Sequence, residues 1–290
     1  MKSCKSTMCM LGILLAFMAV ATAAVAPLLT FKFTSVSVPN AISTVAEGVN
    51  NAGVIVGFYQ DTSGKLHGFM LNGKKVTTID DPKGTATECL HINANGAPSI
   101  VGYYTTSNST PVGFLYQNGT FKDIPGPAGA TGSYAYGIND SGLIVGAYKD
   151  SNGATHGYLL SGTTYTTLDV PKAVATVATG INNSGNIALY WVNSRSIIEG
   201  ALLTGKTYKT INVPGAMDSI AFDLDDAGDV VFEWLDSNDL PHGALRQGTK
   251  YYKFDFPKSL LTFATGINDH HVIVGGTAIT KEVGFKATYN

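Results

Sequence analysis

GINDSGLIVGAY, residues 137–148, returns 43 residues later as GINNSGNIALY, residues 180–190. In both stretches, small and apolar residues lead into a short segment rich in Asn, Asp, Ser and Gly, and a second apolar segment follows. Asn, Asp and Gly supply the local hydrogen bonds and the positive φ angles of a tight turn. The pattern therefore predicts two short antiparallel strands joined by a tight turn.

From residue 31 onward the chain consists of repeats of this unit. Its G-I-N turn, I-V-G-x-Y strand, H-G-F segment and strand-ending proline, or relics of them, occur six times in the same order. The prolines stand 43, 43, 46, 43 and 43 residues apart, at Pro39, Pro82, Pro125, Pro171, Pro214 and Pro257. The units start near residues 31, 74, 119, 163, 206 and 249. Self-similarity at such a period is the signature of a repeat architecture.

Each unit contains four short strands, and no helical period appears. Short strands joined by regular tight turns predict an all-β protein, a six-bladed β-propeller with four-stranded antiparallel blades, as a single domain over residues 31–290. The domain opens on a fourth-strand segment, FKFTSVSVP (31–39), and ends on a third-strand segment, VGFKATYN (283–290). We expect these two to pair, because this closes the ring and removes two exposed edges.

The N-terminus has the pattern of a secretory signal peptide. Lys2 and Lys5 precede an apolar run of 13 residues from Met8 to Val20, and small residues follow up to Ala24. This is the order of a charged region, an apolar region and a cleavage site. A retained membrane anchor is the alternative, but a spanning helix needs about 20 residues. We therefore expect residues 1–24 to be removed, and a secreted or periplasmic bacterial protein with no membrane segment after cleavage.

Charge and cysteine content exclude several classes of protein. Removing Lys2 and Lys5 leaves 17 basic and 21 acidic residues, a net charge near −4, which argues against a nucleic-acid partner. Cys89 then stands alone on an apolar strand, so we expect a buried small hydrophobe and no intramolecular disulfide.

The sequence contains no nucleophile elbow, zinc-protease motif, P-loop or Rossmann fingerprint. We expect a monomer.

The G-I-N-x-x-G, I-V-G-x-Y and H-x-F segments resemble the HAF family of extracellular repeats, and the resemblance covers residues 31–290. This chain has His-Gly-Phe, residues 67–69, where the family has His-Ala-Phe. The histidine is present only in His67, His156 and His242, and the other copies have Val112, Glu199 and Val283. The resemblance implies the repeat fold and bacterial export, and it implies no common activity.

The strand order places both tight turns of each unit on one face and the longer, more variable loops on the other. Propellers usually bind ligands at the mouth of the channel, so we expect a site on the loop face. Alternation along the first strand predicts that its recurring Ala, Gly and Asn positions share the channel side. The Asn position forms either a ring of oxygens around an axial ion or a set of turn caps, and we favour capping. Its members are Asn50, Asn93, Asn139, Asn182, Asp225 and Asn268.

Five polar residues break the repeat near the channel. His91 and Asp223 replace glycine in copies two and five, which lie opposite each other in a ring of six. Glu47 and Glu88 lie on first strands near the loop face, and Asp218 precedes the first strand of copy five. The oxygens of the four carboxylates suit Ca²⁺, and His91 with Glu88 beside a metal would activate water for hydrolysis. The alternative is drift of individual polar residues in a solvated channel.

Other recurring side chains have structural explanations. We expect the three histidines of the H-G-F segments to form structural hydrogen bonds, and Asp61, Asp150 and Asp236 to lie in ordinary turns. Trp191 and Trp234 occupy the Tyr position of the I-V-G-x-Y strand, which indicates packing within blades, with an exposed sugar-binding pair as the alternative.

Three functions are consistent with the sequence. The first is binding of a small molecule, a polymer or a protein on the loop face. The second is a Ca²⁺-dependent hydrolase, a lactonase or esterase, with its site at the mouth of the channel. The third is a structural component of a surface layer. No motif in the chain decides between them.

Overall fold

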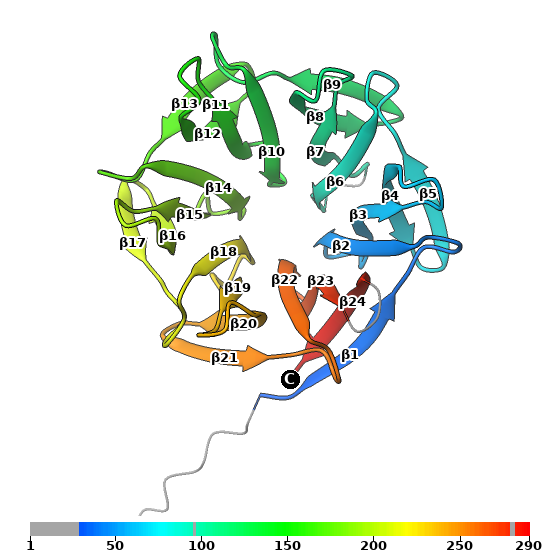
Figure 1. Cartoon of the computed structure of the whole chain (residues 1–290), viewed down its shortest axis with the longest axis vertical. Coiled ribbons are helices and arrows are strands. Elements are labelled where there is room, and N and C mark those ends of the chain that lie inside the picture. Colours follow the sequence, from blue (N-terminus) through cyan, green and yellow to red (C-terminus); the bar gives the residue numbers. More distant parts are fainter. Residues whose placement is uncertain (1–28, 95–96, 279–281) are drawn as a thin grey trace, which may run out of the picture.

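The computed structural model describes residues 29–94, 97–278 and 282–290, so the expected signal peptide, residues 1–24, lies outside the described residues. The described strands form six separate sheets of four strands each. These sheets are arranged as blades around a central channel (Figure 1). The predicted six-bladed β-propeller is confirmed. No helix in the described ranges is long and apolar enough to cross a bilayer.

The strands of blades 1–5 follow chain order from the axis outward, and blade 6 follows it except for its outermost strand (Figure 1). Blade 1 contains β2 (Ser43–Val49), β3 (Ile55–Gln60), β4 (Leu66–Asn72) and β5 (Lys75–Ile79). Blade 2 contains β6 (Ala86–Ile92), β7 (Ile100–Thr105), β8 (Pro111–Gln117) and β9 (Thr120–Ile124). Blade 3 contains β10 (Gly132–Ile138), β11 (Ile144–Lys149), β12 (Thr155–Ser161) and β13 (Thr164–Leu168).

The second half of the ring repeats this order. Blade 4 contains β14 (Ala175–Ile181), β15 (Ile187–Val192), β16 (Ile198–Thr204) and β17 (Thr207–Thr210). Blade 5 contains β18 (Ser219–Leu224), β19 (Val230–Leu235), β20 (Pro241–Gln247) and β21 (Lys250–Phe254). Blade 6 contains β22 (Leu261–Asn268), β23 (Val272–Ala278) and β24 (Glu282–Tyr289), with β1 (Phe31–Val36) as its outermost strand.

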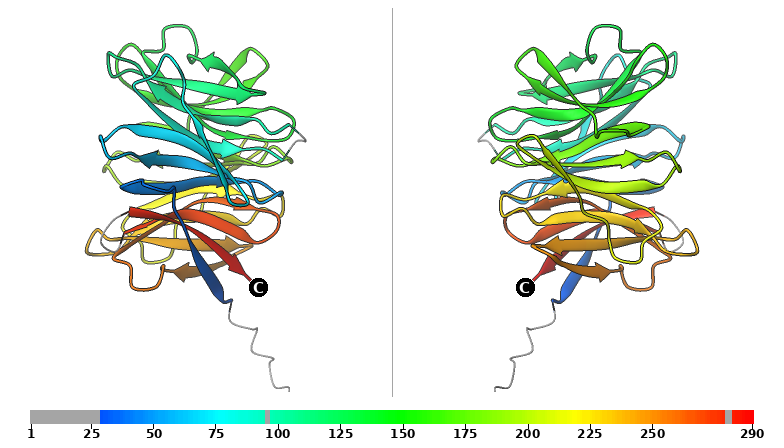
Figure 2. Two further views of the ribbon diagram at one scale, coloured as in Figure 1. Left: turned by 90° about the vertical axis from the view of Figure 1, so that its right-hand side faces the viewer. Right: turned by 90° about the vertical axis from the view of Figure 1, so that its left-hand side faces the viewer.

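The two ends of the domain close the ring as predicted. β1 pairs antiparallel with β24, from Phe31 opposite Tyr289 to Val36 opposite Gly284. Figures 1 and 2 show the two strands lying side by side. The pairing also brings aromatic rings together, with the centroids of Phe31 and Phe254 4.5 Å apart. Backbone hydrogen bonds therefore hold the N-terminal strand in blade 6, and its aromatic side chains pack onto blade 5.

The hydrophobic core lies between neighbouring blades. One cluster joins Val145 and Leu168 of blade 3 to Ile181, Leu189 and other residues of blade 4. Five equivalent clusters occupy the other interfaces among the described residues. Cys89 is fully buried in one of them, as predicted, and burial raises the pKa of its thiol. Because every blade has two neighbours in the ring, every sheet is covered on both faces.

Each inner strand contains a β-bulge at the same position. The pairing of β2 with β3 skips Glu47 between Ala46 and Gly48, and the inner strands of the other five blades shift at the equivalent residue. A bulge places two residues of one strand opposite one residue of its partner and interrupts simple alternation. Ala46 and Val49 consequently both pack in the core. The prediction that the Ala position shares the channel side with Gly and Asn is therefore wrong.

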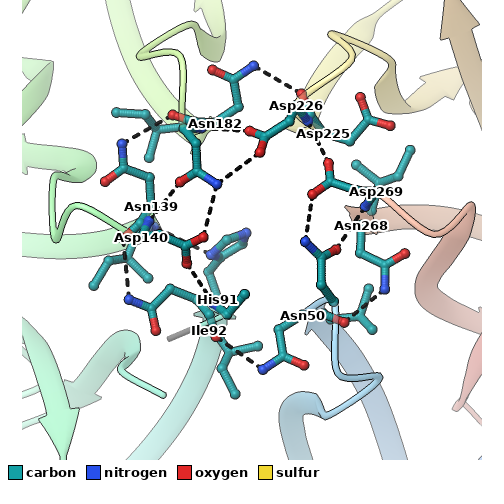
Figure 3. Close-up of a pocket in the computed structure, with 18 of the residues that line it drawn as sticks. Asn50, His91, Ile92, Asn139, Asp140, Asn182, Asp225, Asp226, Asn268 and Asp269 are labelled. Atoms are coloured by element: carbon teal, nitrogen blue, oxygen red, sulfur yellow. Dashed lines mark hydrogen bonds between the residues drawn. The ribbon is translucent and has the colours of Figure 1, made fainter. Parts of the chain in front are cut away.

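The recurring Asn side chains cap the tight turns, as favoured from the sequence. The Asn50 Oδ1 atom accepts hydrogen bonds from the backbone amides of Ala52 and Val54. Its Nδ2 atom also donates to the carbonyl of Asn93 in the next blade, 3.0 Å away. The other four asparagines donate in the same way, to Asn139, Asn182, Asp225 and Asn50 in turn. These side chains therefore link blades as well as capping turns, around a small space of about 60 Å³ (Figure 3).

Asp225 is the one carboxylic acid in this ring of amides. Burial, followed by nearby acidic groups, raises its pKa to about 7. A folded-state pKa above the unfolded value near 3.9 means that the protonated form stabilises the fold, and that this stability is lost as the pH rises towards 7. An amide at this position would not ionise and would retain the donor that its five counterparts use.

Asp225→Asn should therefore stabilise the protein, and more strongly at pH 8 than at pH 4.5. We expect a gain of about 1–3 kcal/mol in the free energy of unfolding at pH 8. Urea unfolding at the two pH values measures it, and Asn182→Asp, with the reverse change and the opposite expected trend, is the control. A gain that does not depend on pH would contradict the raised pKa of Asp225.

Candidate functional site

The central channel contains a cavity of about 250 Å³. The bulge residue of every inner strand lines it: Glu47, Leu90, Tyr136, Thr179, Phe222 and Thr265. Phe58 of β3, Tyr103 of β7, and Glu88 and His91 of β6 complete the lining. The bulge is thus the local feature that directs one side chain from each blade into a shared space.

His91 and Asp223 meet across the channel. The Nε2 atom of His91 lies 3.4 Å from the Oδ2 atom of Asp223. The same carboxylate oxygen accepts a hydrogen bond from the backbone amide of Ile267, and the Ile138 amide donates to Nδ1 of His91 at 3.4 Å. His91 lines both the cavity and the small space inside the Asn ring. The pair therefore forms a floor between the cavity and the tight-turn face.

Glycine occupies this floor position in the other four blades because neighbouring inner strands approach closely there. A Cβ atom at Gly48 would lie 2.8 Å from the carbonyl oxygen of Leu90, and one at Gly266 would lie 2.6 Å from that of Glu47. Both distances are shorter than real Cβ contacts allow. Only blades 2 and 5 carry side chains here, and these two side chains contact each other.

Two glutamates give the cavity its electrostatic character. Burial, then the neighbouring carboxylates of Glu88, Glu282 and Glu233, raises the pKa of Glu47 well above its usual value. Burial also raises the pKa of Glu88, opposed by a hydrogen bond from the Tyr103 hydroxyl. Glu47 lies deep in the protein, yet its side chain remains partly accessible from the cavity. The described residues form no hydrogen bond with its carboxyl group.

Four of the five residues singled out from the sequence belong to this site. Glu47, Glu88 and His91 line the cavity, and Asp223 holds His91 at its floor. Asp218 does not line it, because its carboxylate accepts a hydrogen bond from the Ile198 amide of blade 4, 2.8 Å away. Within the described ranges, no group of three or more His, Cys, Asp and Glu side chains is placed to hold a metal ion.

Sequence reasoning missed the aromatic part of the site. Tyr103, Tyr136, Phe58 and Phe222 line the cavity but were assigned to no site. The missed signal was the variation of the bulge position, which holds Glu, Leu, Tyr, Thr, Phe and Thr in the six copies, while the preceding position is Ala in five copies and the following one is Gly in four. Strict alternation of side chains along the first strand predicts instead that the neighbouring Ala and Gly positions face the channel.

The recurring histidines of the H-G-F segments form structural clusters on the outer strands. The His67 Nδ1 atom lies 2.7 Å from Asp80, and its ring stacks on Tyr59. His156 and His242 repeat this arrangement with Asp169 and Asp255. Their neighbours in the preceding turns, Asp61, Asp150 and Asp236, each accept backbone hydrogen bonds two and four residues along. These side chains have the structural roles expected of them.

Both tryptophans are largely enclosed by their blades. The indole of Trp234 donates to the carbonyl of Gly243 and stacks on His242. Trp191 packs against the core between blades 3 and 4. Packing, rather than an exposed aromatic pair, is confirmed.

The floor pair predicts a strong coupling between two substitutions. His91→Gly leaves the buried Asp223 carboxylate with the Ile267 amide but without its ionisable partner, and we expect it to cost about 3–5 kcal/mol of unfolding free energy. The double variant His91→Gly/Asp223→Gly restores the residue of the other blades and should cost much less than the sum of the single variants. Urea unfolding of all four proteins measures the coupling. Additive losses would show that the two side chains do not stabilise each other.

No protein-family model matches the chain, and no curated protein matches it, so the resemblance to the HAF family stays a prediction. Solved structures do match. Virginiamycin B lyase from Staphylococcus aureus has a TM-score of 0.54 at 12% identity, over 89% of this chain and 99% of that chain.

Two lectin structures are similar at the same level. The SapL1 lectin in complex with alpha methyl fucoside has a TM-score of 0.55 at 10% identity, over 82% of this chain and 88% of that chain. A lectin from Aleuria aurantia in complex with alpha-methyl-L-fucoside has a TM-score of 0.54 at 13% identity, over 89% and 96%. At these identities the similarity establishes the propeller fold alone.

Proposed function

We propose that the protein is a ligand-binding propeller that takes a small organic molecule into the central cavity from the face of the longer loops. The observation that carries the proposal is the variation of the bulge position. A residue that only packs would repeat, as the preceding position does with five Ala and one Cys. Five residue types at six equivalent positions, all facing one cavity, indicate an asymmetric surface suited to an asymmetric ligand.

The construction of the channel supports the same conclusion. The Asn ring and the His91–Asp223 pair occupy its tight-turn end. The opposite end lies among the longer loops, where Ile42, Val174, Met217 and Leu260, each just before or at the start of an inner strand, are exposed. The cavity combines apolar walls with a few polar groups, as small-molecule sites commonly do. The fucoside complexes of two propeller lectins show that proteins of this fold bind small ligands.

A calcium-dependent hydrolase of lactones or esters is the second candidate. Glu88 and His91 both line the cavity, but each already has a partner, because Tyr103 donates to Glu88 and Asp223 contacts His91. We therefore favour binding over catalysis. Turnover of a lactone or aryl ester that stops with a calcium chelator would reverse this preference.

We also propose that the protein is exported. The proposal rests on the charged, apolar and small-residue order of the first 24 residues. The intact mass of the protein from bacterial culture medium or periplasm should correspond to a chain that lacks them.

Filling the cavity should abolish ligand binding. Leu90→Trp adds bulk at a bulge position without removing a polar contact, and the matched control Thr166→Trp adds it on the exposed outer strand β13. In a ¹⁹F NMR screen of a fluorinated fragment library, we expect most hits of the parent to persist in Thr166→Trp and to disappear in Leu90→Trp. Phe222→Trp is the second filling variant, and thermal melting confirms that each variant is folded. Hits that survive in both folded filling variants would overturn the proposed function.

A further inference from the structure

We propose that the ligand of the central cavity is an organic cation, a small amine or quaternary ammonium compound, held by Glu47 and Glu88 against the surrounding aromatic rings. The proposal rests on the function proposed above and specifies its ligand class. Three features of the cavity carry it: an excess of acidic groups, a set of aromatic rings, and a size that suits an organic molecule.

The carboxyl groups of the site have no basic counterpart in the cavity lining. Two carboxyl groups line the cavity, and none of its lining residues is Lys or Arg. Glu233 and Glu282 add to the potential felt by Glu47, and no basic group is among its electrostatic neighbours. His91 is the one lining residue that becomes positively charged when protonated, and its contact with the Asp223 carboxylate leaves the pair with no net positive charge. The complementary ligand is therefore cationic.

The raised pKa of Glu47 shows what a bound cation would change. Burial and the neighbouring carboxylates raise the pKa of Glu47, so the ligand-free site retains protons. An opposite charge within a few ångströms favours the ionised form of a carboxyl group. A bound cation would therefore displace these protons and stabilise the ionised carboxylates.

Aromatic rings surround the same space. Phe58, Tyr103, Tyr136 and Phe222 line the cavity. Tyr134 joins two of them, because its ring centroid lies 4.8 Å from that of Tyr103 and 5.7 Å from that of Tyr136. Aromatic faces attract cations electrostatically, and cages of such rings recognise quaternary ammonium groups. Rings and carboxylates together suit an organic cation better than either does alone.

The size of the cavity and its remaining polar groups further restrict the chemical class of the ligand. A cavity of about 250 Å³ accommodates a small organic molecule, and no cluster of metal-ligating side chains occurs within the described ranges. The two threonine hydroxyls of the lining use their protons within the protein, since Thr179 donates to the carbonyl of Ala221 and Thr265 to that of Ala46. An ammonium group needs neither hydroxyl, because the carboxylates and the rings can hold it.

The decisive comparison uses choline and 3,3-dimethylbutan-1-ol, which have the same shape and differ in the positive charge. Isothermal titration calorimetry should show choline binding at least tenfold more tightly than the alcohol. Glu47→Gln and Glu88→Gln should each weaken choline binding at least fivefold without weakening alcohol binding. Glu199→Gln, which changes a carboxylate that bonds Asn193 outside the cavity, should leave both affinities unchanged.

The pH dependence gives a second readout. Choline does not titrate, so its affinity should rise with pH as Glu47 and Glu88 lose their protons, and the rise should be smaller in Glu47→Gln. Repeating the titration in two buffers of different ionisation enthalpy measures the protons released. The titratable groups that face Glu47 are Glu88, His91, Tyr103, Tyr136, Glu233 and Glu282, and the His91→Gln variant identifies any share of the rise that comes from the imidazole.

The possible outcomes separate this inference from the proposed function. Equal or tighter binding of the alcohol, or of alpha methyl fucoside, that is lost in Leu90→Trp would overturn the cation and retain the ligand-binding cavity. Choline binding that persists in Leu90→Trp would overturn the cation at this site. Absence of choline binding together with absence of cavity-dependent fragment hits would overturn both.

Discussion

One residue of each inner strand has no partner on the second strand of its blade, and this bulge turns its side chain into the channel. Six bulges at one level produce the cavity lining, and the small Ala and Gly residues on either side allow the inner strands to approach closely. The bulge thereby separates two tasks within one short strand. The flanking residues hold neighbouring blades together, and the bulge residue is free to differ from blade to blade.

The two ends of the channel are built differently. At the tight-turn end, asparagine side chains donate hydrogen bonds to backbone carbonyls of the next blade. The His91–Asp223 pair crosses the axis beneath them. At the other end, longer loops lead into the inner strands. This polarity follows from the four-stranded meander, which places both tight turns of every blade on one face. A molecule in the cavity would therefore contact the His91–Asp223 pair towards the tight-turn face and the longer loops towards the opposite face.

Much of the fold could be predicted from the sequence, because the six copies of the repeat give six residues to compare at each structural position. The blade number, the strand order and the pairing of residues 31–39 with 283–290 follow from the repeat and from the need to cover edges. The facing pair His91 and Asp223 followed from counting blades around a ring. The bulge could not be predicted in this way, because all six copies contain it and the repeat length therefore does not reveal it. Strict alternation along the first strand then placed the Ala position on the channel side, which is wrong. Tyr103 and Phe58 lie on second strands, and nothing in the sequence repeat indicates that side chains of these strands reach the channel.

The proposed organic cation lies between Glu47 and Glu88 inside the ring. The most direct test is a crystal structure with (2-bromoethyl)trimethylammonium, whose bromine gives an anomalous signal that locates the molecule independently of the density around it. The predicted result is a peak within the channel cavity, with the trimethylammonium group against the two carboxylates. A peak confined to the outer surface of the blades, or a channel filled by ordered water alone at saturating probe, would contradict the claim.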